Sequence, residues 1–252
     1  MKIGLVLSGG GVRGVGHLGA IQVLKELDIR IDCIAGTSAG AIVGAFIASG
    51  YSPQEGLAIT EKIKMFDWHT FNIGSLGFLK MSSIEKVLRE YLPENYENLD
   101  IPLYVCATDI LNNCCVFFNQ GPLIPTILAS SGIPVIYEPV KHNGTYYVDG
   151  GVVNNLPVEA IRNQCDKIIA VHVNSLSNEK KEPTFKDIVE RSFHLSINQG
   201  VYAKTSYIDI FIDPPDMSRF SMFDIKNAQK IFEYVYNYTS RMKDKIISQL
   251  NG

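Results

Sequence analysis

The sequence lacks the features that would mark several broad classes of protein. Only 19% of its 252 residues are charged, and 23 Lys and Arg against 26 Asp and Glu leave a net charge of −3, so no basic surface for nucleic acid is expected. It has no internal repeat, no low-complexity tract and no linker-like stretch. Because apolar residues make up 46% of the chain, we expect a single folded domain over residues 1–252.

The cysteines are odd in number and form no CxxC pair, which argues against a disulfide framework or a thiolate metal site. Most of them lie in apolar runs, so we expect buried thiols in a reducing compartment. We predict no metal ion and no cofactor. The cysteines are Cys33, Cys106, Cys114, Cys115 and Cys165.

A clean membrane-spanning or secretory segment is also missing. The apolar stretch Ile3–Leu7 is too short for a signal peptide. Residues 33–54 are uncharged over 22 positions, which is long enough to span a bilayer, but glycines, serines and Pro53 interrupt them. A buried strand, turn and helix fit this segment better, and we expect a cytoplasmic protein.

Alternation of strand-like and helix-like segments dominates what is present, and it predicts a three-layer α/β/α sandwich with a mostly parallel central sheet. The expected strands cover residues 2–8, 31–35, 101–108, 113–118, 146–148, 167–173 and 207–213. The expected helices end near Leu27 and near Gly50, open at Ser82, and cover about 156–163, 184–199 and 225–249.

A nucleophile-elbow pattern, Gly36-Thr37-Ser38-Ala39-Gly40, stands between the second strand and the second helix. The form G-x-S-x-G in this context indicates an exposed serine on a sharp turn, with Gly36 and Gly40 making the turn possible. The helix N-terminus beneath Ser38 favours developing negative charge. The alternative is a tight turn whose serine only caps the helix.

A glycine loop, Gly9-Gly10-Gly11-Val12-Arg13-Gly14, follows the first strand. A dinucleotide site would need an acidic residue at the end of strand two, and a P-loop would need a lysine; neither is present. Parallel strands would bring this loop beside Ser38, with its N–H groups as an oxyanion hole and Arg13 available to bind an anionic group. A loop that only packs helix on strand, or a non-enzymatic anion- or nucleotide-binding module, remains the alternative.

A nucleophilic serine needs a base, and Asp149 is the best candidate. It ends a strand and is followed by Gly150 and Gly151, which would present it at a sheet edge, although a turn-forming role is also open. A Ser-Asp-His hydrolase could use His172 or His194, but it would place G-x-S-x-G later in the chain. The remaining histidines are His17, His69 and His142.

Taken together, these motifs resemble the bacterial patatin-like phospholipase family. The resemblance spans about residues 1–175 and rests on the glycine loop, on Gly36–Gly40, on Ala129–Pro134 and on Asp149-Gly150-Gly151 continuing to Pro157. It implies a lipid acyl hydrolase in which Ser38 attacks an ester, Asp149 serves directly as base, and amides near Gly10 and Gly11 hold the oxyanion.

The same resemblance implies an acyl-enzyme intermediate, an acyl lipid substrate and transient contact with a membrane surface. With no histidine in the reaction, we expect no imidazole limb near pH ~6.5 in the pH–rate profile. The sequence specifies no oligomeric state.

Residues 65–81 gather the only tryptophan with three phenylalanines and two methionines. This composition suits an aromatic lid that docks on a bilayer, and equally a loop folded over the core. The uncharged segment Leu111–Tyr137 is the expected surface for an acyl chain.

Overall fold

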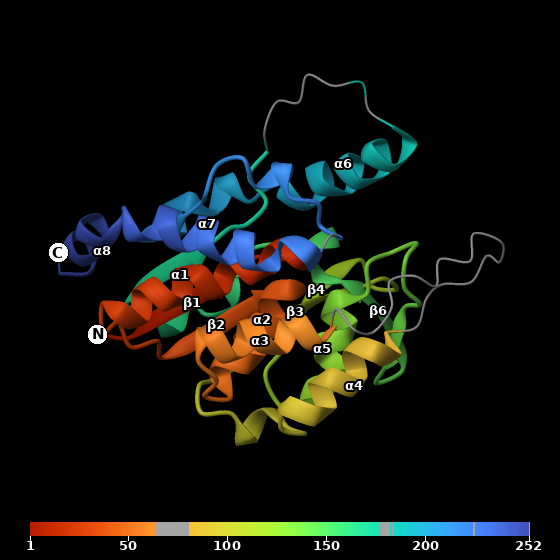
Figure 1. The fold of residues 1–252 in the computed structure, drawn as a ribbon. Coiled ribbons are helices and arrows are strands. Elements are labelled where there is room, and N and C mark those ends of the chain that lie inside the picture. The colour runs from red at the N-terminus through yellow and green to blue at the C-terminus, as the bar shows by residue number, and fades with distance from the viewer. Residues whose placement is uncertain (64–80, 177–181, 183, 224, 252) are drawn as a thin grey trace.

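A mixed sheet of eight strands forms the centre of the computed structural model, which describes residues 1–63, 81–176, 182, 184–223 and 225–251 (Figure 1). The segment predicted as a lid, 65–81, therefore lies outside the described residues except for Met81, which is buried.

The sheet has the order β5-β6-β3-β2-β1-β7-β8, with β4 paired to β3 off this path. The strands from β3 through β2, β1 and β7 to β8 run parallel, whereas β4, β5 and β6 pair antiparallel. Their bounds are β1 Ile3–Leu7, β2 Cys33–Thr37, β3 Leu103–Asp109, β4 Cys114–Phe118, β5 Val140–His142, β6 Thr145–Asp149, β7 Lys167–Val171 and β8 Ile210–Ile212.

Successive side chains of the central strands alternate between two apolar layers, as buried parallel strands require. On β1, Leu5 and Leu7 join the larger core with α1, α2 and α7, while Val6 packs with Leu156 and Ile161 on the other face. Figure 1 shows α1 and α7 lying side by side. The predicted fold class is confirmed. The helices are α1 Val15–Glu26, α2 Ala39–Ala48, α3 Pro53–Ile63, α4 Ser82–Tyr91, α5 Leu123–Ser131, α6 Phe185–Asn198, α7 Ala228–Ser240 and α8 Lys243–Asn251.

One edge of β3 brings together two chain segments that are far apart in sequence. β2 runs parallel to β3 and ends with Thr37 opposite Cys106, while β6 runs antiparallel and ends with Asp149 opposite Ala107. Both must share one edge, because β4 pairs with Val105–Asp109 and so occupies the other. The two strands therefore meet end to end, and whatever follows Thr37 faces Asp149.

Two predicted helices differ from the structure. Residues 156–163 form two short 3-10 turns, Val158–Ala160 and Arg162–Gln164, whose backbone bonds reach back only two or three residues. The predicted C-terminal helix is divided between α7 and α8 at residues 241–242. Just before this break, the buried Thr239 donates its hydroxyl to the Val235 carbonyl, a bond that bends helices.

The prolines of segment 111–137 do not prevent a helix there. Pro122 precedes α5 and Pro125 stands in its first turn, where backbone N–H groups have no intrahelical acceptor to lose. Residues 33–54 form β2, α2 and the start of α3, which agrees with the strand, turn and helix predicted for this segment. Across the described ranges, the helices are too short or too polar to cross a membrane.

Candidate active site

Ser38 stands between β2 and α2 in a backbone conformation that most residues avoid. Its φ is 53° and its ψ is −121°, the strained geometry of a nucleophile elbow. The flanking glycines are needed because the chain doubles back so tightly. A Cβ on Gly36 would lie 2.5 Å from the Gly40 carbonyl oxygen, and one on Gly40 would lie 2.3 Å from the Leu7 oxygen.

Ser38 and Asp149 are in direct contact. Ser38 Oγ donates to Asp149 Oδ2 at 2.6 Å, and the other carboxyl oxygen accepts from the Gly151 N–H at 2.8 Å. Asp149 is only 3% exposed, and this burial raises its pKa from 3.8 to about 6, although the bonds from Ser38 and Gly151 oppose the rise. The carboxyl is thus a stronger base than an exposed aspartate while still ionised at neutral pH.

Ser130 of α5 and Thr108 of β3 fix the two halves of this pair. The Ser38 N–H donates to Ser130 Oγ at 2.7 Å, and Ser130 Oγ donates to the Cys106 carbonyl at 2.6 Å. Thr108 Oγ1 donates to the Asp149 carbonyl at 2.9 Å. Sequence reasoning missed both supports. In the sequence, Ser130 was noted only as part of the stretch Ala129–Pro134, and Thr108 only as the last residue of an expected strand.

The glycine loop lies against the nucleophile, since a Cβ on Gly9 would be 3.2 Å from Ser38 Cβ. The Gly9 N–H donates to the Asn155 carbonyl, whereas the N–H groups of Gly10 and Gly11 have no acceptor in the part of the chain that the structure describes. Gly11 also lines the same cavity as Ser38, so these N–H groups are the candidates in the loop for holding an oxyanion.

The other predicted glycines serve close packing around this loop and the Asp149 turn. A Cβ on Gly14 would meet Ala39 Cβ at 2.4 Å, and one on Gly150 would meet the Cys106 carbonyl oxygen at 2.2 Å. Side chains at these positions would separate the loop from the elbow, or Asp149 from β3.

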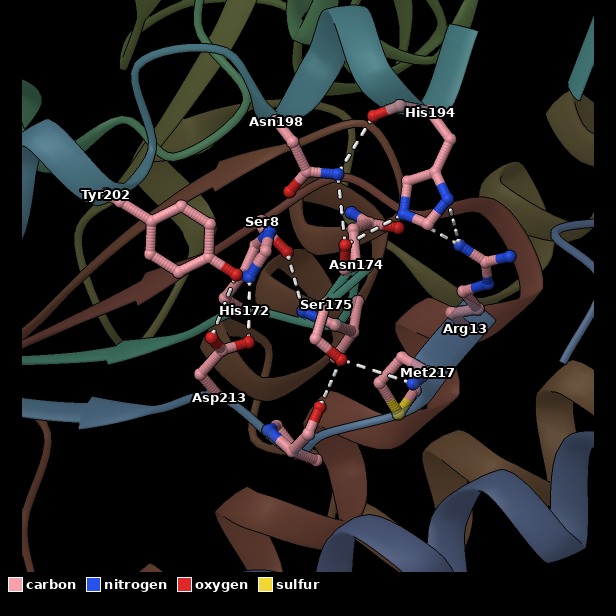
Figure 2. A network of polar contacts seen from close by, with 12 residues as sticks. Ser8, Arg13, His172, Asn174, Ser175, His194, Asn198, Tyr202, Asp213 and Met217 are labelled. Atoms are coloured by element: carbon pink, nitrogen blue, oxygen red, sulfur yellow. Dashed lines mark hydrogen bonds and ion pairs between the residues drawn. The ribbon is translucent and has the colours of Figure 1, made fainter. Parts of the chain in front are cut away.

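Arg13 does not occupy the position expected of an anion-binding residue. Its side chain is 2% exposed, and its Nε donates to the Phe220 carbonyl at 2.6 Å. Its guanidinium also donates to His194 Nδ1 at 3.2 Å (Figure 2). We correct the expectation accordingly: Arg13 fastens the glycine loop to α6 and to the segment after β8, because its donors are turned into the protein.

The described histidines do not complete a Ser-Asp-His triad. His194 Nε2 donates to the Asn174 carbonyl, and His172 Nδ1 bonds to Asp213 at 2.9 Å (Figure 2). His17 Nε2 donates to the Ser8 carbonyl, and burial lowers the pKa of both His17 and His194 to about 4. His142 packs edge-on against Phe118, and His69 lies outside the described residues.

Asn155 is a further site residue that sequence reasoning quoted only as part of a motif. Its side chain is 4% exposed, and within the described residues neither amide atom has a hydrogen-bond partner. A Cβ on Gly9 would lie 2.5 Å from Asn155 Oδ1, and one on Gly151 would lie 3.0 Å away. The amide therefore fills the space between the glycine loop and the Asp149 turn, and its packing holds the two apart.

An apolar cavity of about 130 Å³ opens beside Ser38. From the segment 111–137, which was expected to receive an acyl chain, only Ser131, Ile133 and Tyr137 reach it. The other walls come from the glycine loop, the start of α1, α2, α3, α4 and the segment after β8. They include Val12, Val15, Ile42, Val43, Ile84 and Met222.

Comparison with known proteins agrees with this architecture. A family model described as patatin-like phospholipase matches residues 5–162. An uncharacterized NTE family protein of Mycobacterium tuberculosis is 34% identical over 180 residues, covering 69% of this chain and 49% of the relative. Lysophospholipase NTE1 of Kluyveromyces lactis is 28% identical over 279 residues, covering 94% of this chain and 19% of the relative.

Among solved structures, VipD from Legionella pneumophila has the same fold. It superposes with a TM-score of 0.57 at 16% identity, covering 97% of this chain and 67% of VipD. The chain spans about half the length of the mycobacterial relative and about a fifth of the yeast one. The family match extends over more than half of the chain and includes the elbow, the glycine loop and Asp149, so the chain belongs to the patatin-like phospholipase family.

Proposed function

We propose that this chain is a lipid acyl hydrolase that cleaves carboxylic esters with Ser38 as nucleophile and Asp149 as base. The observation that carries the proposal is the 2.6 Å bond from Ser38 Oγ to a buried carboxylate. A serine hydroxyl is a poor nucleophile until a base accepts its proton, and here the base is already in hydrogen-bonding contact.

The reaction runs in two halves. Ser38 Oγ attacks the ester carbonyl carbon while its proton passes to Asp149 Oδ2, and the N–H groups of Gly10 and Gly11 stabilise the oxyanion. Collapse of this intermediate expels the alcohol, which takes the proton from Asp149 and leaves the acyl group on Ser38. Asp149 then removes a proton from water as it attacks the acyl carbonyl carbon, and returns that proton to Ser38 Oγ when the carboxylic acid leaves. A pKa of about 6 suits both roles near neutral pH.

Phospholipids and lysophospholipids are the proposed substrate class. The apolar cavity beside Ser38 suits an acyl chain, and the yeast relative is named a lysophospholipase. Exposed apolar side chains lie close to the site residues in sequence. Val135, two residues after Ile133 of the cavity, is 85% exposed, and Val152 and Val153, which follow Gly151, are also exposed. They support transient contact with a membrane surface.

Hydrolysis of a short-chain ester and of lysophospholipid by Ser38→Ala and Asp149→Asn tests the proposal. Each variant should lose at least about 10³-fold in kcat, and the double variant should be hardly worse, because nucleophile and base act as a unit. A fluorophosphonate probe should label wild type but not Ser38→Ala. Asp166→Asn, at the opposite end of the parallel strands, is the matched control and should stay active.

Three results would contradict the proposal. Substantial turnover by Asp149→Asn would remove the aspartate from its role as base. A folded histidine variant as inactive as Ser38→Ala would favour a triad. Absence of both labelling and hydrolysis in wild type would favour a binding module built on the glycine loop.

A further inference from the structure

Two cysteine thiols touch on one face of the β3–β4 pair. Cys106 stands opposite Phe117 and Cys115 opposite Thr108, so the two cysteines are diagonal neighbours across the strands. Their sulfur atoms are 3.7 Å apart, with the Cys106 thiol donating to Cys115 Sγ. Cys106 is fully buried, but Cys115 is only half-buried and Cys114 is exposed, unlike the uniformly buried thiols expected from the sequence.

The surroundings of Cys115 favour its thiolate form. Besides the Cys106 thiol, the Asn154 side-chain amide donates to Cys115 Sγ at 3.8 Å. At the other end of the same amide, Lys204 Nζ donates to Asn154 Oδ1 at 2.6 Å. These donors, chiefly Cys106, lower the pKa of Cys115 to about 7 against the opposing effects of burial and of the nearby Glu159 carboxylate. The same bond, together with burial, raises the pKa of Cys106.

We propose that Cys115 and Cys106 form a modification site that hydroperoxides oxidise to an internal disulfide. The Cys115 thiolate attacks the terminal oxygen of a hydroperoxide, so an S–O bond forms and the O–O bond breaks. The alkoxide or hydroxide that leaves takes up a proton, and Cys115 becomes a sulfenic acid. Cys106 then attacks Cys115 Sγ, losing its own proton to the departing hydroxide. Two thiols and one hydroperoxide thus give a disulfide, an alcohol or water, and a further water.

The position of β4 allows this bond to close. The sulfur atoms must approach from 3.7 Å to about 2.05 Å, and diagonal neighbours need some backbone movement to do so. Within the described residues β4 pairs only with β3, so one side of it carries no strand that would oppose the shift. A bridge strained in this way is readily reduced, as expected of a reversible site.

Asn154 connects the cysteine pair with the catalytic residues. Its carbonyl accepts from Thr37 Oγ1 and lies 3.6 Å from Cys106 Sγ, where it is the alternative acceptor for the single thiol hydrogen. Its N–H donates to the Gly150 carbonyl beside Asp149. Disulfide formation removes the Cys106 donor and weakens the acceptor at Cys115. We therefore expect the oxidised protein to hydrolyse esters more slowly, an expectation that rests on the proposed function.

Hydrogen peroxide treatment followed by mass spectrometry without reductant tests the site itself. Cleavage before Asp109 separates the two cysteines, so only a disulfide can hold the two peptides together. We expect the linked peptide in wild type and in Cys114→Ser, with the loss of two hydrogen atoms. Cys106→Ser should instead give a Cys115 sulfenic acid that dimedone traps, and Cys115→Ser should give neither product.

Oxidation of Cys114 before Cys115, or peroxide-treated wild type without the linked peptide, would overturn the proposal. The same samples are assayed for ester hydrolysis before and after dithiothreitol. A reversible loss of at least about threefold in wild type, absent in Cys115→Ser, supports the link through Asn154. A bridge that leaves the rate unchanged refutes that link, and a reduced protein without any hydrolysis refutes the proposed function while the peptide result still decides the cysteine site.

Discussion

Replacement of Asp149 by Asn should make the protein inactive and at the same time more stable at neutral pH. Asp149 is buried with no cation beside it among the causes of its pKa shift, so the fold holds a carboxylate that water would solvate better. Asn has nearly the same shape and retains both contacts. Its oxygen can accept from the Gly151 N–H, and its amide can donate to Ser38 Oγ.

The size and pH dependence of the effect follow from the shift of the Asp149 pKa from 3.8 to about 6. Such a shift corresponds to roughly 3 kcal/mol by which the charged form destabilises the fold. The neutral form is favoured in the folded protein, so this loss is absent below pH 3.8, grows between pH 3.8 and about 6, and is complete above. About 3 kcal/mol corresponds to about 6–12 °C in Tm for a domain of this size, as an upper bound.

Thermal unfolding of wild type and Asp149→Asn at several pH values between 4 and 8 measures the effect. The variant should melt higher at pH 8, and the difference should shrink towards zero as the pH approaches 4. Asp166→Asn, which changes an exposed carboxylate, provides the control for general effects of charge. A variant that melts lower at pH 8, or a difference that does not change with pH, would refute the argument from burial.

Three other predictions concern the same site. The kcat/KM for ester hydrolysis should fall as the pH drops through about 6, because Asp149 is then protonated. An imidazole would give a limb at a similar pH, but the apparent pKa of a carboxyl changes much less with temperature, so measurements at two temperatures identify the group. Arg13→Ala should lower Tm by an amount corresponding to about 2–4 kcal/mol and reduce turnover of anionic and neutral esters by the same factor, whereas a selective loss on anionic lipids would restore its anion-binding role. Asn155→Ala should lower kcat about 10–100-fold, because the side chain packs between Gly9 and Gly151 and its loss lets the glycine loop and the Asp149 turn shift; an unchanged kcat would show that it does not position the site.

The prediction of a pH profile without an imidazole limb stays a prediction, and the structure adds a carboxyl limb close to the same pH. Burial raises the pKa of Asp149 to about 6, a shift whose size the sequence alone does not give. The sequence shows that an Asp-Gly-Gly turn ends a strand, but it does not show how little water reaches the carboxyl. That depends on packing by α5, β3 and the glycine loop.

Local signals in the sequence determined the motifs and the fold class. The glycines around Ser38 and in the loop at 9–14 reflect backbone geometry that few other residues adopt, and alternating strands and helices restrict the sheet to a mostly parallel order. These features depend on neighbouring residues, and so they can be read from a single chain.

Only the tertiary structure decided which of these features meet and in what state. Ser38 and Asp149 are 111 positions apart, and they touch because β2 and β6 end against one edge of β3. The inward turn of Arg13 and the contact of Cys106 with Cys115 likewise depend on partners distant in sequence or on the opposite strand. The physical reason is that side-chain direction, burial and pKa are properties of the packed environment, which no local pattern of residues specifies.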